Sequence, residues 1–342
     1  MVEQVATEQL VLEQVIAARL ADPDDVVLAR DILGTTDPPV IAAQVRAFVP
    51  GITGCPLFTL SVGAVFVLDR GDERIVLKIH RFGAGLRDFH TFDELTAVYA
   101  AQAALAGAGI ACARVLEAPR RFAPGRAAAV MSFVDPGAAD DPHAPATAVA
   151  MATEAARLSR VLSGSVGPAA GVGATLPDRT RLPPTLFPPA HNALFDFTRP
   201  GGEWIDRRAA AARAVLDQGI TPTAMHCDFS CANVRVVGGR VAAIYDVDSV
   251  CVIDEPRCVA SMAVHYTYTG DYPWTWPSRE QARTFVAAYE AARGTPFTAA
   301  ERARLNAGAI YALAYTSRCE HGHAGAAGMC EVLASAPERY FD

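Results

Sequence analysis

A change in the spacing of the apolar residues near residue 57 sets the first limit on how this chain folds. Residues 57–60, 64–68 and 74–79 are rich in β-branched and aromatic side chains, which favours three short β-strands. The tetrapeptide Arg-Gly-Asp-Glu at 70–73 separates the second segment from the third, as in a β-hairpin. The first half of the chain is therefore predicted to contain a small β-sheet.

A helix and a further strand follow this predicted sheet. Residues 88–106 have helical spacing, and Gly107 follows them as a stop signal. Four large apolar side chains share one face of that helix: Phe89, Phe92, Leu95 and Tyr99. Residues 127–134 form another apolar segment, which the sequence Asp-Pro-Gly closes. The order of strands, one helix and a further strand predicts a small α+β lobe.

The remaining segments are predicted to be mainly helical. Residues 1–50 are expected to form an N-terminal helical extension. Beyond the small lobe, helices are expected at residues 147–162, 207–216 and 279–293, and residues 299–333 are expected to be mostly helical. Thr147 is the expected N-cap of the first of these, and residues 234–245 are predicted to form a hairpin across two glycines. The proline-rich segment 164–202 is predicted to be a long loop, of the kind that is usually functional or mobile.

Composition excludes several classes of protein. Of the 342 residues, 51% are apolar, which is enough for a sizeable core and excludes a disordered chain. The net charge of -7 argues against a general nucleic-acid binder. No segment approaches the roughly 18 uninterrupted apolar residues of a membrane span, and the N-terminus lacks the pattern of a signal peptide. The eight cysteines are too sparse for a disulfide scaffold, so a reduced, cytoplasmic protein without membrane or nucleic-acid partners is expected.

One residue type is almost missing from the chain. Lys and Arg together number 30, and Lys78 is the single lysine among them. Arginine replaces lysine easily on a surface but poorly where a compact ammonium group must lie among phosphates. Lys78 lies in a predicted strand and is therefore a candidate for phosphate binding. Chance survival of one lysine, with its ammonium group reaching water, explains the composition equally well.

The segment from His226 to Asn233 carries the clearest chemical pattern. Asp228 and Asn233 are five positions apart, and Asp246 follows the predicted hairpin. Phosphoryl transfer from a nucleotide requires a carboxylate at the acceptor hydroxyl, oxygen ligands for Mg²⁺ and a fixed cation at the phosphates. The kinase catalytic loop has the same spacing from Asp to Asn. The pattern therefore points to phosphoryl transfer.

In these motifs the chain resembles the aminoglycoside phosphotransferase and choline kinase superfamily, the small-molecule branch of the protein-kinase-like fold. The resemblance extends over roughly residues 55–320. It implies an α+β, two-lobed fold with a small β-rich N-lobe at 51–134 and a larger, mainly helical C-lobe at 135–342, preceded by the extension at 1–50. One departure from the family motif is Cys227, which stands where glycine is usual.

The resemblance also implies a role for each matching residue of the larger lobe. Asp228 would be the catalytic base, and Asn233 and Asp246 would hold Mg²⁺. Asp248 either contacts the metal region or the acceptor, or is a helix cap, and the sequence favours neither reading.

For the smaller lobe the resemblance implies nucleotide contacts. Lys78 would bind the phosphates of ATP or GTP and pair with Glu94, whose longer side chain favours it over the adjacent aspartate. The hinge strand with Met131 and Phe133 would offer backbone groups to the base of the nucleotide. Gly63 alone marks the loop that covers the nucleotide.

The implied function is transfer of the γ-phosphate of ATP or GTP to a hydroxyl of a small molecule, by a monomer or homodimer. The acceptor would be an aminoglycoside-like antibiotic, an amino sugar or an amino alcohol. One alternative is a nucleotide-binding pseudokinase or scaffold without phosphotransfer. Another is a metal hydrolase built on His226, Asp228 and Asp246, although His226 is expected to hold the loop by hydrogen bonds. The aromatic segment 266–276 either packs in the core or binds the acceptor.

Overall fold

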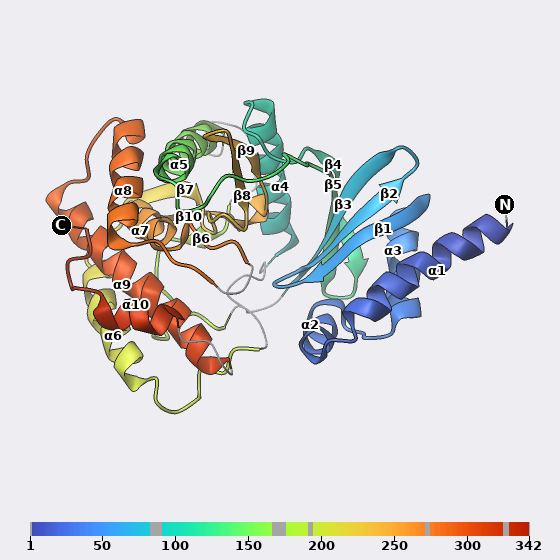
Figure 1. The fold of residues 1–342 in the computed structure, drawn as a ribbon, viewed down its shortest axis with the longest axis horizontal. Helices are drawn as coiled ribbons and strands as arrows, with labels where there is room; N and C mark the ends of the chain where they lie inside the picture. The colour runs from blue at the N-terminus through green and yellow to red at the C-terminus, as the bar shows by residue number, and fades with distance from the viewer. Residues whose placement is uncertain are drawn as a thin grey trace. The chain divides into compact units, whose positions relative to one another are not determined.

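The computed structural model describes residues 2–82, 91–165, 176–190, 194–270, 274–323 and 328–341. The chain forms two compact units, of which the first holds a five-stranded sheet and the second holds most of the helices (Figure 1). Unit 1 consists of Met1–Tyr99, Ala113–Phe133 and Pro189–Phe195, and unit 2 of Ala100–Cys112, Val134–Pro188 and Asp196–Asp342. The α+β fold class predicted from the sequence is confirmed.

The sheet of unit 1 is antiparallel throughout, in the strand order β1-β2-β3-β5-β4. Its strands are β1 (Ile52–Leu60), β2 (Ala64–Arg70), β3 (Glu73–Arg81), β4 (Val115–Ala123) and β5 (Arg126–Ser132). The predicted hairpin joins β2 to β3, with Arg70 opposite Glu73. Gly71 in its turn has a φ of +60°, a conformation that glycine adopts without steric cost. Four of the five strands were predicted, and β4 was not.

Three helices precede the sheet: α1 (Val2–Arg19), α2 (Pro23–Leu33) and α3 (Pro38–Phe48). Their buried side chains form one hydrophobic cluster with Ile75, Leu77 and Ile79 of β3. Side chains alternate between the two faces of a strand, so these three residues mark one face of the sheet. The N-terminal helices therefore pack on that face, and Lys78 and His80 of β3 project from the opposite face.

Helix α4 (Phe92–Gly107) includes most of the predicted helix 88–106. Leu95 and Tyr99 of its predicted apolar face are buried, whereas Asp88 and Phe89 lie outside the described residues. The helix begins with a reciprocal cap between Thr91 and Glu94, in which each side chain accepts a hydrogen bond from the other residue's backbone N–H at 3.1 Å.

Unit 2 contains a small sheet that was not predicted, with the strand order β6-β10-β7. Its strands are β6 (Asp178–Arg179), β7 (Pro222–His226) and β10 (Val250–Asp254). The predicted hairpin is formed by β8 (Val234–Val237) and β9 (Arg240–Ile244), with both turn glycines at positive φ. The helices of unit 2 are α5 (Pro145–Ser165), α6 (Glu203–Leu216), α7 (Glu255–His265), α8 (Arg279–Arg293), α9 (Ala299–Gly322) and α10 (Gly328–Ser335). In the described parts of the chain, no helix is both long enough and apolar enough to cross a membrane.

Local capping explains why some predicted helix bounds in unit 2 hold and others do not. Ser278 and Thr298 each form a capping box, which fixes the starts of α8 and α9 at the predicted positions. The prediction of Thr147 as an N-cap is wrong, because α5 begins at Pro145 and the Thr147 hydroxyl donates to the Asp141 carbonyl at 2.8 Å. Residues 299–333, predicted to be mostly helical, form two helices: α9 ends at Gly322 and α10 begins six residues later.

Candidate active site

The candidate catalytic loop begins where β7 ends, at the fully buried His226. The Nδ1 atom of His226 accepts the backbone N–H of Asp228 at 3.2 Å, and its Nε2 atom lies 3.0 Å from the Tyr245 carbonyl oxygen. This pattern requires the ring proton on Nε2, which then donates to the carbonyl. His226 thus ties the loop to the residue before Asp246, and its predicted structural role is confirmed.

Asn233 closes the same loop and joins it to the β8–β9 hairpin. Its side-chain Nδ2 donates to the carbonyl oxygen of Asp228 at 2.9 Å. Its own carbonyl accepts the backbone N–H of Tyr245 at 2.7 Å. Residues 228–233 therefore form a loop that the hydrogen bond from the Asn233 side chain to Asp228 closes. The amide Oδ1 of Asn233 is an oxygen atom of the kind that can coordinate a cation.

Asp246 follows β9 in a left-handed conformation, with φ 51° and ψ 37°. Within the described residues it is the one non-glycine residue at positive φ. Aspartate tolerates this region better than most residues, and such conformations concentrate at functional sites. The Asp246 carbonyl also accepts the N–H of Ser249 at 2.8 Å, which starts a short 3-10 turn over Val247–Ser249. Unit 2 therefore brings Asp228, Asn233 and Asp246 into one hydrogen-bonded framework through His226 and Tyr245.

Three thiols that the sequence did not group lie beside this loop. The Sγ atoms of Cys227 and Cys251 are 2.7 Å apart. Hydrogen bonds from the Cys251 and Cys258 thiols hold the pKa of Cys227 below its ordinary value, because they stabilise the thiolate. Burial raises the pKa of Cys251. The Cys227 side chain, which stands where glycine is usual, thus contacts side chains of β10 and α7.

Lys78 lies in the centre of the sheet of unit 1 and is 6% exposed. It is flanked by Val65 of β2 and Ala129 of β5. His80, two residues along β3, points from the same face, and its Nε2 lies 2.8 Å from the hydroxyl oxygen of Tyr99 on α4. Lys78 therefore projects from the side of the sheet that meets α4, away from the N-terminal helices.

The predicted hinge residues belong to the same unit as Lys78. Met131 of β5 pairs with Val76 of β3, so it lies on the Lys78 face of the sheet. Phe133 follows β5, its N–H donates to the carbonyl of Arg74 at 3.3 Å, and the Arg74 guanidinium lies over its ring. The structure therefore brings Lys78 and Met131 to one face, and binding of a nucleotide base there stays a prediction. So does the predicted pairing of Lys78 with Glu94, whose side chain caps α4.

Gly63 lies at the turn between β1 and β2, close to Lys78. A Cβ at this position would lie 2.8 Å from the carbonyl oxygen of Ile79 and 3.8 Å from Cε of Lys78. We expect Gly63→Ala to shift the turn against β3, to lower the free energy of unfolding by about 1–3 kcal/mol and to weaken nucleotide binding. A thermal melt and a nucleotide titration measure both effects.

Gly164→Ala is the matched control, because a Cβ there meets no atom within 4 Å. If Gly63→Ala melts and binds nucleotide like the control, the close approach of this turn to β3 has no role in binding.

The model of one protein family matches this sequence over residues 61–305, a span that contains both Lys78 and the Asp228 loop. The chain belongs to the phosphotransferase enzyme family. It is therefore a phosphotransferase, and the family predicted from the motifs is confirmed. No curated protein matches the sequence at a significant level.

Solved structures similar to this phosphotransferase show the same fold. A microcompartment-associated aminopropanol kinase is 15% identical, with a TM-score of 0.57 over 86% of this chain and 93% of that protein. A choline/ethanolamine kinase family protein from Mesorhizobium loti is 20% identical, with a TM-score of 0.50 over 89% of this chain and 91% of that protein. The likeness spans nearly the whole length of both proteins, which confirms the kinase-like fold.

In the aromatic segment of this phosphotransferase, core packing is seen for one residue, and acceptor binding by the others stays a prediction. Tyr266 is fully buried and stacks on Phe285, so it packs in the core. Tyr268 stacks on Trp276 with ring centroids 5.5 Å apart and an interplanar angle of 8°. Trp276 is half-buried, and among the described residues its indole N–H has no hydrogen-bond partner. Tyr272 lies outside the described residues.

Proposed function

We propose that this phosphotransferase moves the γ-phosphate of ATP or GTP to a hydroxyl group of a small molecule such as an aminoglycoside-like antibiotic, an amino sugar or an amino alcohol. The observation that carries the proposal is the set of hydrogen bonds that joins Asp228 and Asn233 to each other, and that joins Asn233 and His226 to Tyr245, the residue before Asp246. These residue types supply what phosphoryl transfer requires, a carboxylate at the acceptor and oxygen ligands for a cation.

Asp228 is the proposed catalytic base. Its backbone N–H and carbonyl are held by His226 and Asn233, so the position of its Cα is fixed independently of its carboxylate. The carboxylate would orient the acceptor hydroxyl and take its proton as the phosphate is transferred. Most of the rate enhancement would come from positioning and charge stabilisation.

Mg²⁺ fits the residues proposed to hold it. Magnesium prefers oxygen ligands, and Asn233 and Asp246 offer an amide oxygen and a carboxylate from two segments that a 2.7 Å hydrogen bond joins. The ion, when bound, would neutralise charge on the phosphates. The ammonium group of Lys78 is proposed to hold the phosphates, with Glu94 fixing its position. The backbone at Met131 and Phe133 is proposed to contact the base.

We expect Asp246→Ala to weaken Mg²⁺-dependent nucleotide binding by about tenfold, because one charged ligand is lost. Fluorescence titration of the nucleotide with and without Mg²⁺ measures the effect. Asp246→Asn is the matched variant, since asparagine also tolerates the left-handed conformation of this position. It should keep the melting temperature of the native protein and still lose Mg²⁺ dependence. Unchanged Mg²⁺ dependence in both variants contradicts the assignment.

The acceptor pocket is proposed to be bordered by the segments 164–202 and 266–276. The stacked pair of Tyr268 and Trp276 offers flat aromatic faces, which suit sugars and cationic groups. Hydrogen exchange with a true acceptor bound tests this: protection in either segment supports it, and no change in both places the pocket elsewhere.

The function itself is tested by an acceptor screen with ATP and with GTP, in which transfer of labelled γ-phosphate is measured. Transfer to at least one hydroxyl compound supports the proposal. Nucleotide binding without transfer or background hydrolysis indicates a pseudokinase or scaffold instead. Light scattering in the same preparation tests the proposed monomer or homodimer. A cytoplasmic location, without nucleic-acid or membrane partners, belongs to the same proposal.

A further inference from the structure

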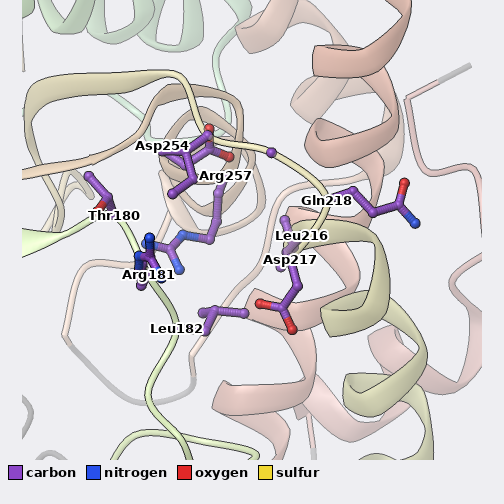
Figure 2. Close-up of a pocket in the computed structure, with 10 residues that line it drawn as sticks. Thr180, Arg181, Leu182, Leu216, Asp217, Gln218, Asp254 and Arg257 are labelled. Carbon is purple, nitrogen blue, oxygen red and sulfur yellow. The ribbon is translucent and has the colours of Figure 1, made fainter.

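A cavity of about 590 Å³ opens in unit 2 (Figure 2). It is lined by residues of the segment after β6, the end of α6, the end of β10 and the start of α7. In the β7–β10 pair, Asp254 at the cavity is opposite Pro222, while the catalytic loop leaves the other end of β7. At about 3.3 Å per residue, the two ends of β7 are roughly 13 Å apart. The cavity is therefore separate from the proposed base Asp228.

Arg257 of α7 is a buried cation in this cavity. Its side chain points from α7 into the cavity, and the residue is only 9% exposed. Its Nη2 donates to the carbonyl oxygen of Arg179, and throughout the described chain no carboxylate lies within ion-pair distance of its guanidinium. Burying a charge without an opposite charge is costly, so a buried arginine normally has an acidic partner.

A second arginine lines the same cavity, again with no acidic partner in the part of the chain that the structure describes. This residue, Arg181, follows β6. The two carboxylates of the lining have partners of their own. Asp254 pairs with Arg304 at 3.3 Å, and Asp217 pairs with Arg213 at 3.4 Å. The cavity therefore holds two positive guanidinium charges that no carboxylate of its lining balances. The protein as a whole is negatively charged, with a net charge of -7.

We propose that this cavity is a binding site for an organic phosphomonoester, held by Arg181 and Arg257. A phosphomonoester carries about −1.5 to −2 charges near pH 7, which matches two guanidinium groups, whereas a carboxylate carries one. The planar guanidinium offers paired donors to phosphate oxygens. Leu182 and Leu216 add apolar walls, which suit the carbon skeleton of an organic ligand. The volume is within the usual range for small-molecule sites.

The test is calorimetric titration with glycerol 3-phosphate, with ADP and Mg²⁺ at saturation so that the proposed nucleotide site is filled. We expect saturable binding that Arg181→Ala weakens by about tenfold. Arg181 is exposed, so this variant should fold normally. Arg257→Lys keeps the buried charge but loses the fork of donors, and it should weaken binding with an unchanged melting temperature. Arg339→Ala, which removes one exposed charge elsewhere on unit 2, is the matched control and should bind like the native protein.

Three results would overturn the proposal. The first is that glycerol 3-phosphate shows no saturable binding to the native protein, and the second is that Arg181→Ala binds it as tightly as the Arg339→Ala control does. The third is that the dicarboxylate glutarate binds more tightly than the phosphomonoester. Each result is independent of whether Asp228 transfers phosphate, because binding is measured directly and at the far end of β7.

Discussion

Replacing Asp228 with asparagine is expected to reduce the rate of phosphate transfer by about a thousandfold while nucleotide affinity stays unchanged. The amide has the size of the carboxylate but cannot take a proton from the acceptor hydroxyl. The hydrogen bonds that hold the loop use the backbone of Asp228, so they remain. Steady-state transfer rates and a nucleotide titration on the same preparation measure the two quantities.

Asp72→Asn is the matched control for this experiment. Asp72 lies in the exposed turn between β2 and β3, so the same chemical change there should leave the transfer rate intact. Loss of nucleotide affinity in Asp228→Asn, with transfer retained, would show that Asp228 belongs to the nucleotide site and is not the base.

Replacing Lys78 with arginine is expected to damage transfer nearly as much as replacing it with methionine, by about a hundredfold or more in both cases. Lys78 is 6% exposed between β2 and β5 in the centre of the sheet, where little room remains for a larger, planar group. The guanidinium would also present its charge at a different position from the compact ammonium group. Transfer rates and a thermal melt of both variants measure the effect.

Arg240→Lys is the reciprocal control, an exchange of the same two residue types at an exposed position of β9. It should leave both rate and melting temperature unchanged. Full activity of Lys78→Arg would favour the alternative explanation, in which the single lysine survived by chance and arginine serves as well there as at the other basic positions.

The elements that the sequence predicted are those with strong local signals. The hairpins at Gly71 and at Gly238 and Gly239 were predicted because each turn uses glycine at positive φ. The predicted start of α8 agrees with the structure, in which Ser278 supplies a capping box next to the first helical turn. Such interactions join residues a few positions apart, so the sequence contains all of the partners.

The elements that were missed depend on partners far along the chain. Strand β4 contains Pro119 and has shifts in its pairing with β5, and proline in a strand normally indicates an edge or an irregular segment. Strand β10 is a short apolar run, which sequence alone does not distinguish from part of a buried helix. Its neighbours in the sheet, β6 and β7, are 20 or more residues away.

For the candidate site, the sequence by itself determined the residue types and the spacing. The interval from Asp228 to Asn233 and the position of Asp246 after a hairpin are enough to indicate the phosphotransferase family. Spacing within a loop is local, because a hydrogen bond from the side chain of Asn233 to the carbonyl of Asp228 closes over five residues.

Tertiary structure alone decided which face of the sheet presents Lys78 and which distant charges share a cavity. The N-terminal helices bury Ile75, Leu77 and Ile79, and this packing leaves Lys78 on the opposite face. Arg181 and Arg257 are 76 positions apart and meet one cavity because β6 pairs with β10, directly before α7. Such placements depend on the pairing of distant strands and on the burial of apolar surface, which are properties of the whole folded chain and not of any short segment.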